Sequence, residues 1–441
     1  MKDDGGTSRR RPFAFPVVSL KVAQSNPSTR GVIHYTLAMK LLYVTESVPN
    51  RDPELGDGSS MIPYEVILHL PADVAVTLLT FSGPVPVPAA IRNRCETVYE
   101  LAPREELSAF VRSLGGLTGL GKQRRATPSA RAAAARLSAG QDATLIHGPH
   151  ALFLSHHITG PLVLQTVDPW SIRAGMDTAI ARTFRPAYRL REELAARAER
   201  QLPARARLLT VGAQDAAAWA AKLGRPVRSI PNGTEVATGP RRRRDVPVVC
   251  FAGSLNYAPN VDSAAVLVER IAPKVWREVP DARFVIAGRR PTPAVQALAG
   301  PQVEVLANVP SILDVFHGAD VAVFPDEHGV GIRNSVLEAL AAGLPVVATP
   351  VAARELPSHP LLAVEGSMDA LVRRVVEQLR LPRAAQEPPQ GPRQGAPQDG
   401  STGGTAVRTW ETVAGEYLAE VRAAVAASSP AGALSQPNRQ P

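Results

Sequence analysis

The stretch VAVFPDEHGVGIRNSVLEALAAGLPVVAT, residues 321–349, decides the fold of this chain. It begins with an apolar, β-branched run that Pro325 ends, and it finishes with a second run of the same kind, PVVAT. Between them SVLEALAA has the spacing and composition of a helix, and Gly343 stands where a glycine commonly follows a helix. We therefore expect strand, loop, helix and strand, the repeating unit of a parallel α/β sheet.

The loop and the first helical turn of this stretch carry the candidate ligand-binding residues. Gly331 permits close approach of the backbone to a ligand, and Arg333, Asn334 and Ser335 fall at the helix N-terminus, where free N–H groups and the helix dipole favour an anion. Glu338 lies one turn further on, and its carboxylate can accept two hydrogen bonds from a sugar diol. An anion site beside a diol site suits a nucleotide-sugar. An ordinary capped βαβ unit with an incidental glutamate would have the same pattern.

Length and composition set wider limits on the class of protein. The chain has 441 residues, 45% of them hydrophobic, which is enough for two or three domains with substantial cores. It contains no apolar run long enough for a transmembrane helix and no signal-peptide segment, and its two cysteines are too few for a disulfide framework or a metal site. We therefore expect a cytoplasmic protein.

The net charge of +9 raises the question of acidic partners. Nucleic acid is not expected, because no nucleic-acid motif accompanies the charge and aromatic residues make up only 5% of the chain. Arginine-rich helices in the first half could instead lie against an anionic membrane, as a peripheral contact at its inner face, or they could simply be solvated.

Strands alternate with helices along most of the chain, and this alternation predicts parallel sheets covered on both faces. The pattern closes once near Gly233 and restarts at VPVVCFAG, so two doubly wound domains are expected. Residues 115–131 should form a mobile surface loop, because they are rich in Gly, Ser and Arg. The predicted parts are a disordered leader (1–38), a first domain (39–234), a linker (235–246), a second domain (247–383), a disordered insert (384–405), an amphipathic helix (406–427) and a tail (428–441).

Glycines and polar residues lie at or beyond the ends of several predicted strands. In the first domain they are Gly58, Ser59, His147, His150 and Asp168; in the second they are Gly253, Ser254, Asn256, Asn260 and Arg289. Because the carboxyl ends of parallel strands meet at one edge of a sheet, these residues and the loop before Glu338 should line one crevice. The two histidines and Asp168 could each act as a base or bind a hydroxyl group, or each could be a hydrogen-bonded structural residue.

Four motifs in fixed order give a resemblance to a known family. They are IPNG (230–233), VVCFAGSLNYAPNVDSA (248–264), DARFVIAGRRP (281–291) and GIRNSVLEALAAGLPVVATP (331–350). Together they resemble glycosyltransferase family 4 of the GT-B fold, especially bacterial members that build surface polysaccharides. The resemblance covers residues 227–381 and continues, more weakly, over 40–211. It implies two tandem Rossmann-like domains and a C-terminal helix that crosses back to the first.

The resemblance also implies roles for individual residues. Glu338 matches the glutamate that binds the donor ribose, Gly58 and Ser59 match the glycine loop of the first domain, and residues 331–335, with Ile332 among them, would cradle the diphosphate and the transferred sugar. Ser254 and Asn256 stand in the region where many relatives carry Arg and Lys. Arg333 and Arg289 must then supply the positive charge.

Two positions depart from the family pattern. Val330 stands where the first glutamate of the family's pair would be, and Asp326 or Glu327 could replace it. The usual Thr-x-His reads Thr-Val-Asp at 166–168, which leaves Asp168 to act on the sugar or acceptor.

The resulting expectation is a retaining glycosyltransferase that moves a hexose-type sugar from a nucleotide-diphosphate sugar to a glycan or lipid-linked acceptor in cell-surface polysaccharide or glycolipid biosynthesis. Asp168 and Arg333 are its candidate catalytic residues, and His147 and His150 its acceptor-side residues. No metal or other cofactor is expected, and the sequence has no Asp-x-Asp motif. Two alternatives stay open: a catalytically degenerate GT-B partner subunit, suggested by Val330 and Asp168, and a GT-B nucleotide-sugar epimerase.

Overall fold

The structure is a computed structural model that describes residues 39–52, 54–56, 58–102, 127–180, 185–235, 245–328, 332–356, 358–381 and 408–428. The predicted leader, insert and most of the tail lie outside these ranges, as do Val330, Gly331 and most of the predicted linker. Most of the predicted loop at 115–131 also lies outside them. Its last residues are described, and they are helical rather than irregular, because Thr127 caps a helix that begins at Pro128.

The first sheet has seven strands in the order β3-β2-β1-β4-β5-β6-β7, and all neighbouring strands are parallel. Its strands are β1 (Met39–Thr45), β2 (Val74–Phe81), β3 (Thr97–Leu101), β4 (Ala143–His147), β5 (Leu162–Gln165), β6 (Arg207–Thr210) and β7 (Val227–Ser229). The order reverses between β1 and β4. This position is the switch point of the sheet, where neighbouring strands send their connections to opposite faces. In doubly wound sheets a crevice opens there at the carboxyl edge.

The second sheet repeats this arrangement with six parallel strands in the order β10-β9-β8-β11-β12-β13. Its strands are β8 (Val248–Ser254), β9 (Arg283–Arg289), β10 (Val303–Ala307), β11 (Val321–Phe324), β12 (Val346–Ala348) and β13 (Leu362–Val364). Here the switch point lies between β8 and β11.

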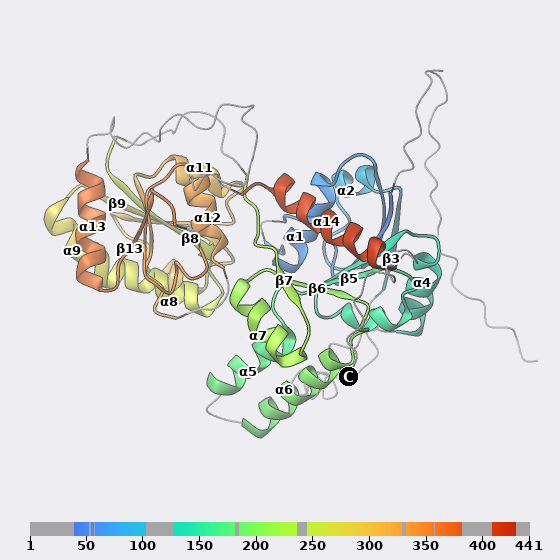
Figure 1. Cartoon of the computed structure of the whole chain (residues 1–441). Coiled ribbons are helices and arrows are strands. Elements are labelled where there is room, and N and C mark those ends of the chain that lie inside the picture. Colours follow the sequence, from blue (N-terminus) through green and yellow to red (C-terminus); the bar gives the residue numbers. More distant parts are fainter. Residues whose placement is uncertain are drawn as a thin grey trace, which may run out of the picture. The chain divides into compact units, whose positions relative to one another are not determined.

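Helices follow most of the strands in both domains (Figure 1). Those of the first domain are α1 (Gly58–His69), α2 (Ala89–Arg94), α4 (Pro128–Ser138), the 3₁₀ helix η2 (Leu152–His157), α5 (Trp170–Ile180), α6 (Arg185–Arg200) and α7 (Ala213–Leu223). Those of the second are α8 (Ala258–Val266), the π turn η3 (Leu267–Ile271), α9 (Ala272–Glu278), α10 (Pro293–Gln296), α11 (Ile312–His317), α12 (Asn334–Ala341) and α13 (Met368–Arg380).

The π turn η3 separates α8 from α9, and Pro273 accounts for this interruption of the helix. Proline has no backbone N–H, so the normal bond from position 273 to the carbonyl four residues earlier cannot form. The N–H of Ala272 bonds instead to the carbonyl of Leu267, five residues earlier.

The central β11–α12–β12 unit forms as the sequence predicts. Gly343 has φ of +67°, a left-handed conformation that glycine adopts at little cost. Its N–H bonds to the carbonyl of Leu340, and the N–H of Leu344 bonds to the carbonyl of Ala339, which together make the Schellman ending of a helix. This ending turns the chain sharply into β12.

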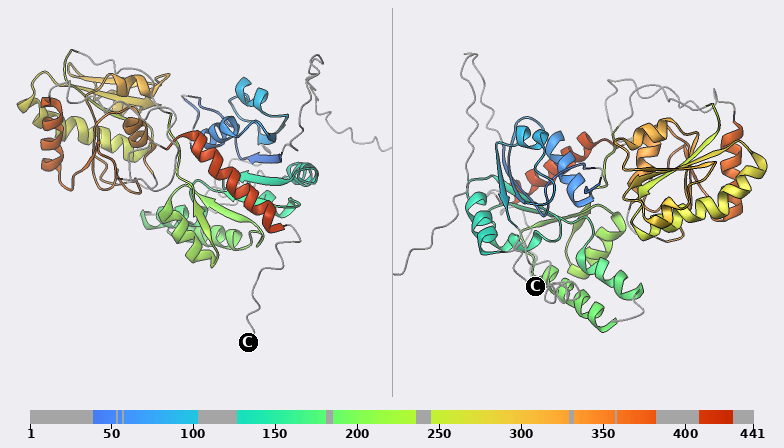
Figure 2. Two further views of the ribbon diagram at one scale, coloured as in Figure 1. Left: turned by 45° about the horizontal axis from the view of Figure 1, so that its top comes forward. Right: turned by 180° about the vertical axis from the view of Figure 1, so that it is seen from behind.

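The C-terminal helix α14 (Trp410–Ser428) packs on the first domain, next to α1 (Figures 1 and 2). Its buried face joins the same hydrophobic cluster as Leu41, Tyr43 and Leu145 of the first sheet; the helix residues in that cluster are Trp410, Val413, Ala414, Tyr417, Leu418, Val421 and Ala424. The predicted fold class, two doubly wound parallel domains with a helix that returns to the first, is confirmed.

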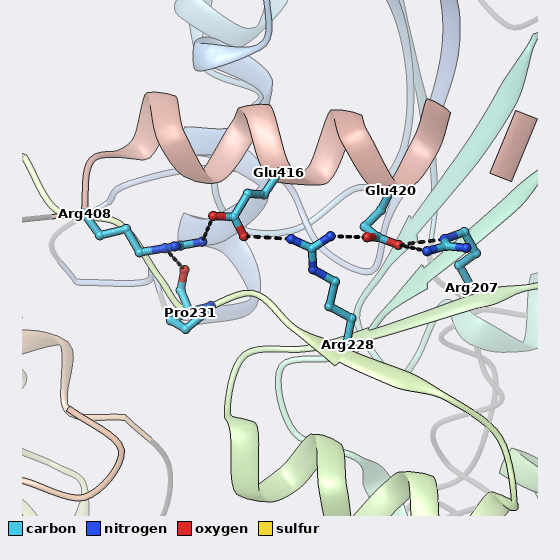
Figure 3. Close-up of polar contacts among 6 residues, drawn as sticks. All are labelled: Arg207, Arg228, Pro231, Arg408, Glu416 and Glu420. Carbon is cyan, nitrogen blue, oxygen red and sulfur yellow. Dashed lines mark hydrogen bonds and ion pairs between the residues drawn. The ribbon is translucent and has the colours of Figure 1, made fainter. Parts of the chain in front are cut away.

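A row of alternating charges also holds α14 in place (Figure 3). Glu420 is 3% exposed and accepts hydrogen bonds from Arg207, at 2.6 Å, and from Arg228. Burial alone would raise the pKa of Glu420, but the hydrogen bonds from these arginines lower it. Glu416 continues the row between Arg228 and Arg408, at 3.5 and 2.8 Å.

Candidate functional site

Several residues predicted to bind the donor lie around the switch point of the second sheet. Ser254 ends β8, and Asp326 follows β11 by two residues. Since these strands are neighbours and both run toward the same edge, their ends face the crevice that doubly wound folds use for ligands.

Arg333 lies at this point and is held from several sides. Its Nη1 is 2.5 Å from Oδ2 of Asp326 and donates to Oδ1 of Asn260 at 2.9 Å. Its guanidinium carbon lies 5.2 Å from the ring centre of Phe251 and 5.0 Å from that of Phe324. Distances of this size allow cation–π attraction, so the arginine is fixed by an ion pair, an amide and two aromatic rings.

The ion pair is buried and further supported. The side chains of Arg333 and Asp326 are 12% and 5% exposed, and Ser263 donates to the second carboxylate oxygen at 2.6 Å. Burial raises the pKa of Asp326, against the opposing effects of Arg333 and of the Ser263 hydrogen bond. The pair carries no net charge, so it attracts a diphosphate less strongly than the unpaired Arg333 of the sequence prediction would.

Two nitrogens of Arg333 nevertheless remain as hydrogen-bond donors. Nε and Nη2 are buried and have no hydrogen-bond partner among the described residues. A buried donor without a partner costs about 1–3 kcal/mol. A ligand with acceptor oxygens would remove that cost, so the geometry still favours the binding of an anion or a sugar by Arg333.

Two glycines allow close packing at the end of β8, next to Asn260, which is 7% exposed. Its amide donates to the carbonyl of Ser254 at 2.9 Å, and a Cβ atom at Gly253 would lie 2.7 Å from that amide nitrogen. A Cβ atom at Gly288, on the neighbouring strand β9, would lie 1.7 Å from the carbonyl oxygen of Gly253. Gly253 was predicted to lie at the crevice, but neither of these packing contacts was predicted.

The remaining predicted residues of the second domain differ in accessibility. Arg289 ends β9 and donates from Nη2 to the hydroxyl of Ser254 at 3.1 Å. Asn256 is exposed, beyond the end of β8. Ile332, Asn334 and Ser335 are all half-buried at the start of α12, while Gly331 lies outside the described residues.

Glu338 lies on the second turn of α12 and is half-buried. Burial raises its pKa to about 7, although the positive charges of Arg51 and Arg289 act in the opposite direction. Its carboxylate is therefore close to half ionised at neutral pH. A ligand whose hydroxyl groups donate to the carboxylate would favour the ionised form.

In the first domain, the predicted glycine loop leads into α1. Gly58 and Ser59 are the first two residues of that helix and are half-buried. A Cβ atom at Gly58 would have its nearest contact 3.8 Å away, at Val167, which is ordinary van der Waals distance. Packing within the described residues therefore does not require glycine at this position.

The switch point of the first sheet contains an acid that the sequence prediction missed. Glu46 follows β1, its side chain is 6% exposed, and its Oε2 accepts the backbone N–H of His150 at 2.7 Å. The Nδ1 atom of the His150 ring lies 3.1 Å from the same oxygen. His150, predicted on the acceptor side, is thus a half-buried residue paired with a buried carboxylate.

His147 lies in a different environment from His150. Its side chain is 0% exposed, and neither ring nitrogen has a hydrogen-bond partner within the described part of the chain. Burial lowers its pKa to about 4, so the imidazole is neutral at physiological pH. The expectation that His147 faces an acceptor is wrong, because its side chain points into the domain.

Asp168 lies beyond the end of β5, at the same edge of the sheet. Its carboxylate is 29% exposed and pairs with Arg173 at 2.9 Å, and its backbone carbonyl accepts from the hydroxyl of Thr166 at 2.6 Å. The nearby carboxyl group of Asp215 has its pKa raised to about 6, mainly by burial and then by the charge of Asp168. Asp168 is accessible to a ligand, but Arg173 already neutralises its charge.

Glu46 and the pairing of Asp326 with Arg333 could not be found from spacing alone. Glu46 is separated from His150 by 104 positions, and the only local signal was an acid directly after a buried strand.

No helix that the structure describes is long and apolar enough to cross a membrane. No three His, Cys, Asp or Glu side chains form a metal-binding group within the described residues.

Comparisons with known proteins agree with this architecture. The family "Glycosyl transferases group 1" matches residues 246–380, which include the whole second sheet and Arg333 with its partners Asp326 and Asn260. A sequence comparison with curated proteins gave no match.

Several solved structures share the fold over most of the chain. HepE of Anabaena, solved in complex with UDP and glucose, is 13% identical, with a TM-score of 0.52 over 88% of this chain and 95% of that chain. WaaG, a glycosyltransferase involved in lipopolysaccharide biosynthesis, is 13% identical, with a TM-score of 0.53 over 88% and 100%. A glycosyltransferase from Rickettsia africae ESF-5 is 10% identical, with a TM-score of 0.55 over 88% and 98%. The chain therefore has the two-domain GT-B fold, and its second domain matches a glycosyltransferase family.

Proposed function

We propose that the protein is a retaining glycosyltransferase that moves a hexose-type sugar from a nucleotide-diphosphate sugar to a glycan or lipid-linked acceptor. The observation that carries the proposal is the cluster at the switch point of the second sheet. There Arg333, which precedes α12 and is paired with Asp326, keeps two buried nitrogens without a hydrogen-bond partner among the described residues, and Glu338 lies on the second turn of α12. The match of residues 246–380 to glycosyltransferases and the UDP complex of the HepE neighbour support this choice.

In the proposed reaction, the acceptor oxygen bonds to the anomeric carbon of the sugar while the bond from that carbon to the diphosphate breaks. The diphosphate leaves with the electron pair and takes up the proton of the acceptor hydroxyl. Arg289, the donors of Arg333 and the N–H groups at the start of α12 would stabilise the negative charge that develops on it, without a metal ion. Attack and departure on the same face of the sugar retain its anomeric configuration.

The test of this proposal is the substitution Glu338→Ala. The ribose hydroxyls lose their acceptor, so we expect binding of UDP, GDP and their sugars to be abolished in isothermal titration calorimetry. Glu269→Ala is a matched control, because Glu269 is an exposed glutamate of the same domain. Unchanged nucleotide affinity in Glu338→Ala would overturn the assignment.

A second measurement separates transfer from the two alternatives. A transferase gives a product only when an acceptor is present, whereas an epimerase changes the sugar of the donor without one. A partner subunit would bind another transferase stably and turn over no donor by itself. Product analysis with and without acceptor therefore distinguishes the three.

A further inference from the structure

The carboxyl edge of the first sheet contains a built arrangement that the donor site does not use. Glu46 follows β1 and His147 ends β4, and these two strands are the neighbours between which the strand order reverses. The N–H of Glu46 bonds to the carbonyl of His147 at 3.2 Å, so the hydrogen bonding between β1 and β4 continues one residue beyond the end of β1. Glu46 therefore lies at the position where a doubly wound sheet opens its crevice.

The turn after β4 is shaped around the Glu46 carboxylate. Gly148 has φ of +94°, and a Cβ atom there would lie 2.4 Å from the carboxyl carbon of Glu46. Only glycine satisfies both conditions. The turn then brings the backbone N–H of His150 to Oε2 of Glu46, at 2.7 Å.

The ring of His150 is oriented by the same oxygen. Nδ1 lies 3.1 Å from Oε2, and the side chain is 29% exposed. A carboxylate accepts hydrogen bonds and cannot donate them, so the neutral imidazole must carry its proton on Nδ1. Nε2 is then an acceptor, and no other described residue bonds to it.

We propose that Glu46 and His150 form a carboxylate–imidazole pair that binds the hydroxyl group of the acceptor, with Nε2 of His150 accepting its hydrogen bond. His150 would contact the acceptor, and Glu46 would act as a positioning residue that fixes the tautomer and the direction of the ring. The ligand class is a sugar hydroxyl on a glycan or glycolipid. This inference rests on the proposed function, since it assigns the acceptor side of the same reaction.

The chemistry of the pair fits a neutral alcohol better than the phosphate groups of the donor. The carboxylate repels phosphate, and an unprotonated Nε2 offers no donor to it. A hydroxyl group, in contrast, can donate to Nε2.

The tautomer of His150 gives a test that does not depend on activity. In long-range ¹H–¹⁵N correlation spectra at pH 8.5, the ring signal that disappears in His150→Gln should show the proton on Nδ1. Glu46→Gln replaces a charged acceptor by a neutral one, so this signal should move toward the mixture of tautomers shown by the exposed His156. A proton on Nε2 in the wild-type protein would overturn the pair.

Transfer kinetics test the acceptor role. With octyl glucoside as the acceptor probe, His150→Gln should raise the acceptor KM by about 5- to 10-fold, the loss expected for one hydrogen bond, and Glu46→Gln by about threefold. The affinity for the nucleotide should stay unchanged in both variants. His156→Ala, in the 3₁₀ helix η2 that follows His150, should transfer sugar as the wild type does.

An acceptor KM of His150→Gln equal to that of the wild type would overturn the acceptor role. A wild-type protein that binds no nucleotide would overturn the proposed function instead, and the acceptor role with it. The spectra would still decide whether the pair exists, so the two failures can be told apart.

Discussion

The two switch points of the molecule each hold a buried acid, but the acids have different partners. In the second domain Asp326 pairs with Arg333, whose side chain is 12% exposed and is flanked by two phenylalanine rings. In the first domain Glu46 pairs with His150, which is 29% exposed and has one ring nitrogen directed away from the acid. The same topology thus supports a closed ion pair at one edge and an accessible pair at the other.

The difference shows how each site can act on a ligand. Arginine stays protonated throughout the physiological range, so the Asp326–Arg333 pair is a fixed framework that presents N–H donors. Histidine can lose its proton in that range and present an acceptor nitrogen. In the proposed reaction a donor anion and an acceptor alcohol would need these opposite properties.

The largest effect is expected from breaking the closed pair. Arg333→Ala leaves Asp326 buried without its cation, so the free energy of unfolding should fall by about 3–5 kcal/mol, measured by urea denaturation. Arg270→Ala is the matched control, because it breaks an ion pair with Glu327 whose partners are 51% and 54% exposed. That change should cost less than about 1 kcal/mol. Equal losses of stability in the two variants would contradict the burial of the Arg333–Asp326 ion pair.

The turn at the accessible pair gives the next largest effect. Gly148→Ala combines a left-handed backbone with a Cβ atom only 2.4 Å from the carboxyl carbon of Glu46, so we expect the free energy of unfolding to fall by about 3 kcal/mol. Gly224→Ala has a similar φ of +64° but no neighbour within 4 Å, and should lose only about 1 kcal/mol. If thermal denaturation gave the same loss for both, the turn would not be built around Glu46.

A third buried acid, Glu420, lies between the two cases. Its partners Arg207 and Arg228 are 41% and 48% exposed, so water can replace the lost contacts when the acid is removed. Glu420→Ala should therefore destabilise the protein by about 2 kcal/mol, less than Arg333→Ala. Glu411→Ala, an exposed position on the same helix, should change the stability by less than about 1 kcal/mol in the same urea titration. A loss of stability as large as that of Arg333→Ala would show that the exposure of the arginine partners does not reduce the cost of removing the acid.

The smallest expected effect is a pH dependence of nucleotide affinity that depends on Glu338 in the second domain. Because the pKa of Glu338 is raised to about 7, its ionised fraction falls as the pH falls through that value. If the carboxylate binds the ribose diol, nucleotide affinity should drop about tenfold between pH 8 and pH 6. Glu338→Gln should bind weakly without this dependence. Calorimetry at several pH values checks both, and a pH-independent wild-type affinity would contradict the role of the carboxylate.

Much of the second-domain site could be predicted, because its residues lie within one local unit. Strand, loop and helix follow one another between Val321 and Ala341, so the placement of Arg333 and Glu338 follows from helix and strand geometry. The neutralisation of Arg333 could not be predicted, since Asn260 and Phe251 come from a different part of the chain. Partners distant in sequence carry no periodic signal.

For the first domain the sequence predicted positions but not environments. His147 and His150 are three residues apart at the end of one strand, so the same role was predicted for both. The structure buries the first and pairs the second with Glu46, because strand alternation turns one ring into the core while the turn at Gly148 directs the other toward the switch point.

The sequence by itself determined the two parallel α/β domains and the returning helix, and it placed the candidate site residues at the carboxyl edges of the sheets, since hydrophobic periodicity and turn residues act over a few positions. Only the tertiary structure decided which charges are paired, which histidine is accessible and which acid keeps a raised pKa. These properties depend on burial and on distances between residues far apart in the chain, and both are set by packing.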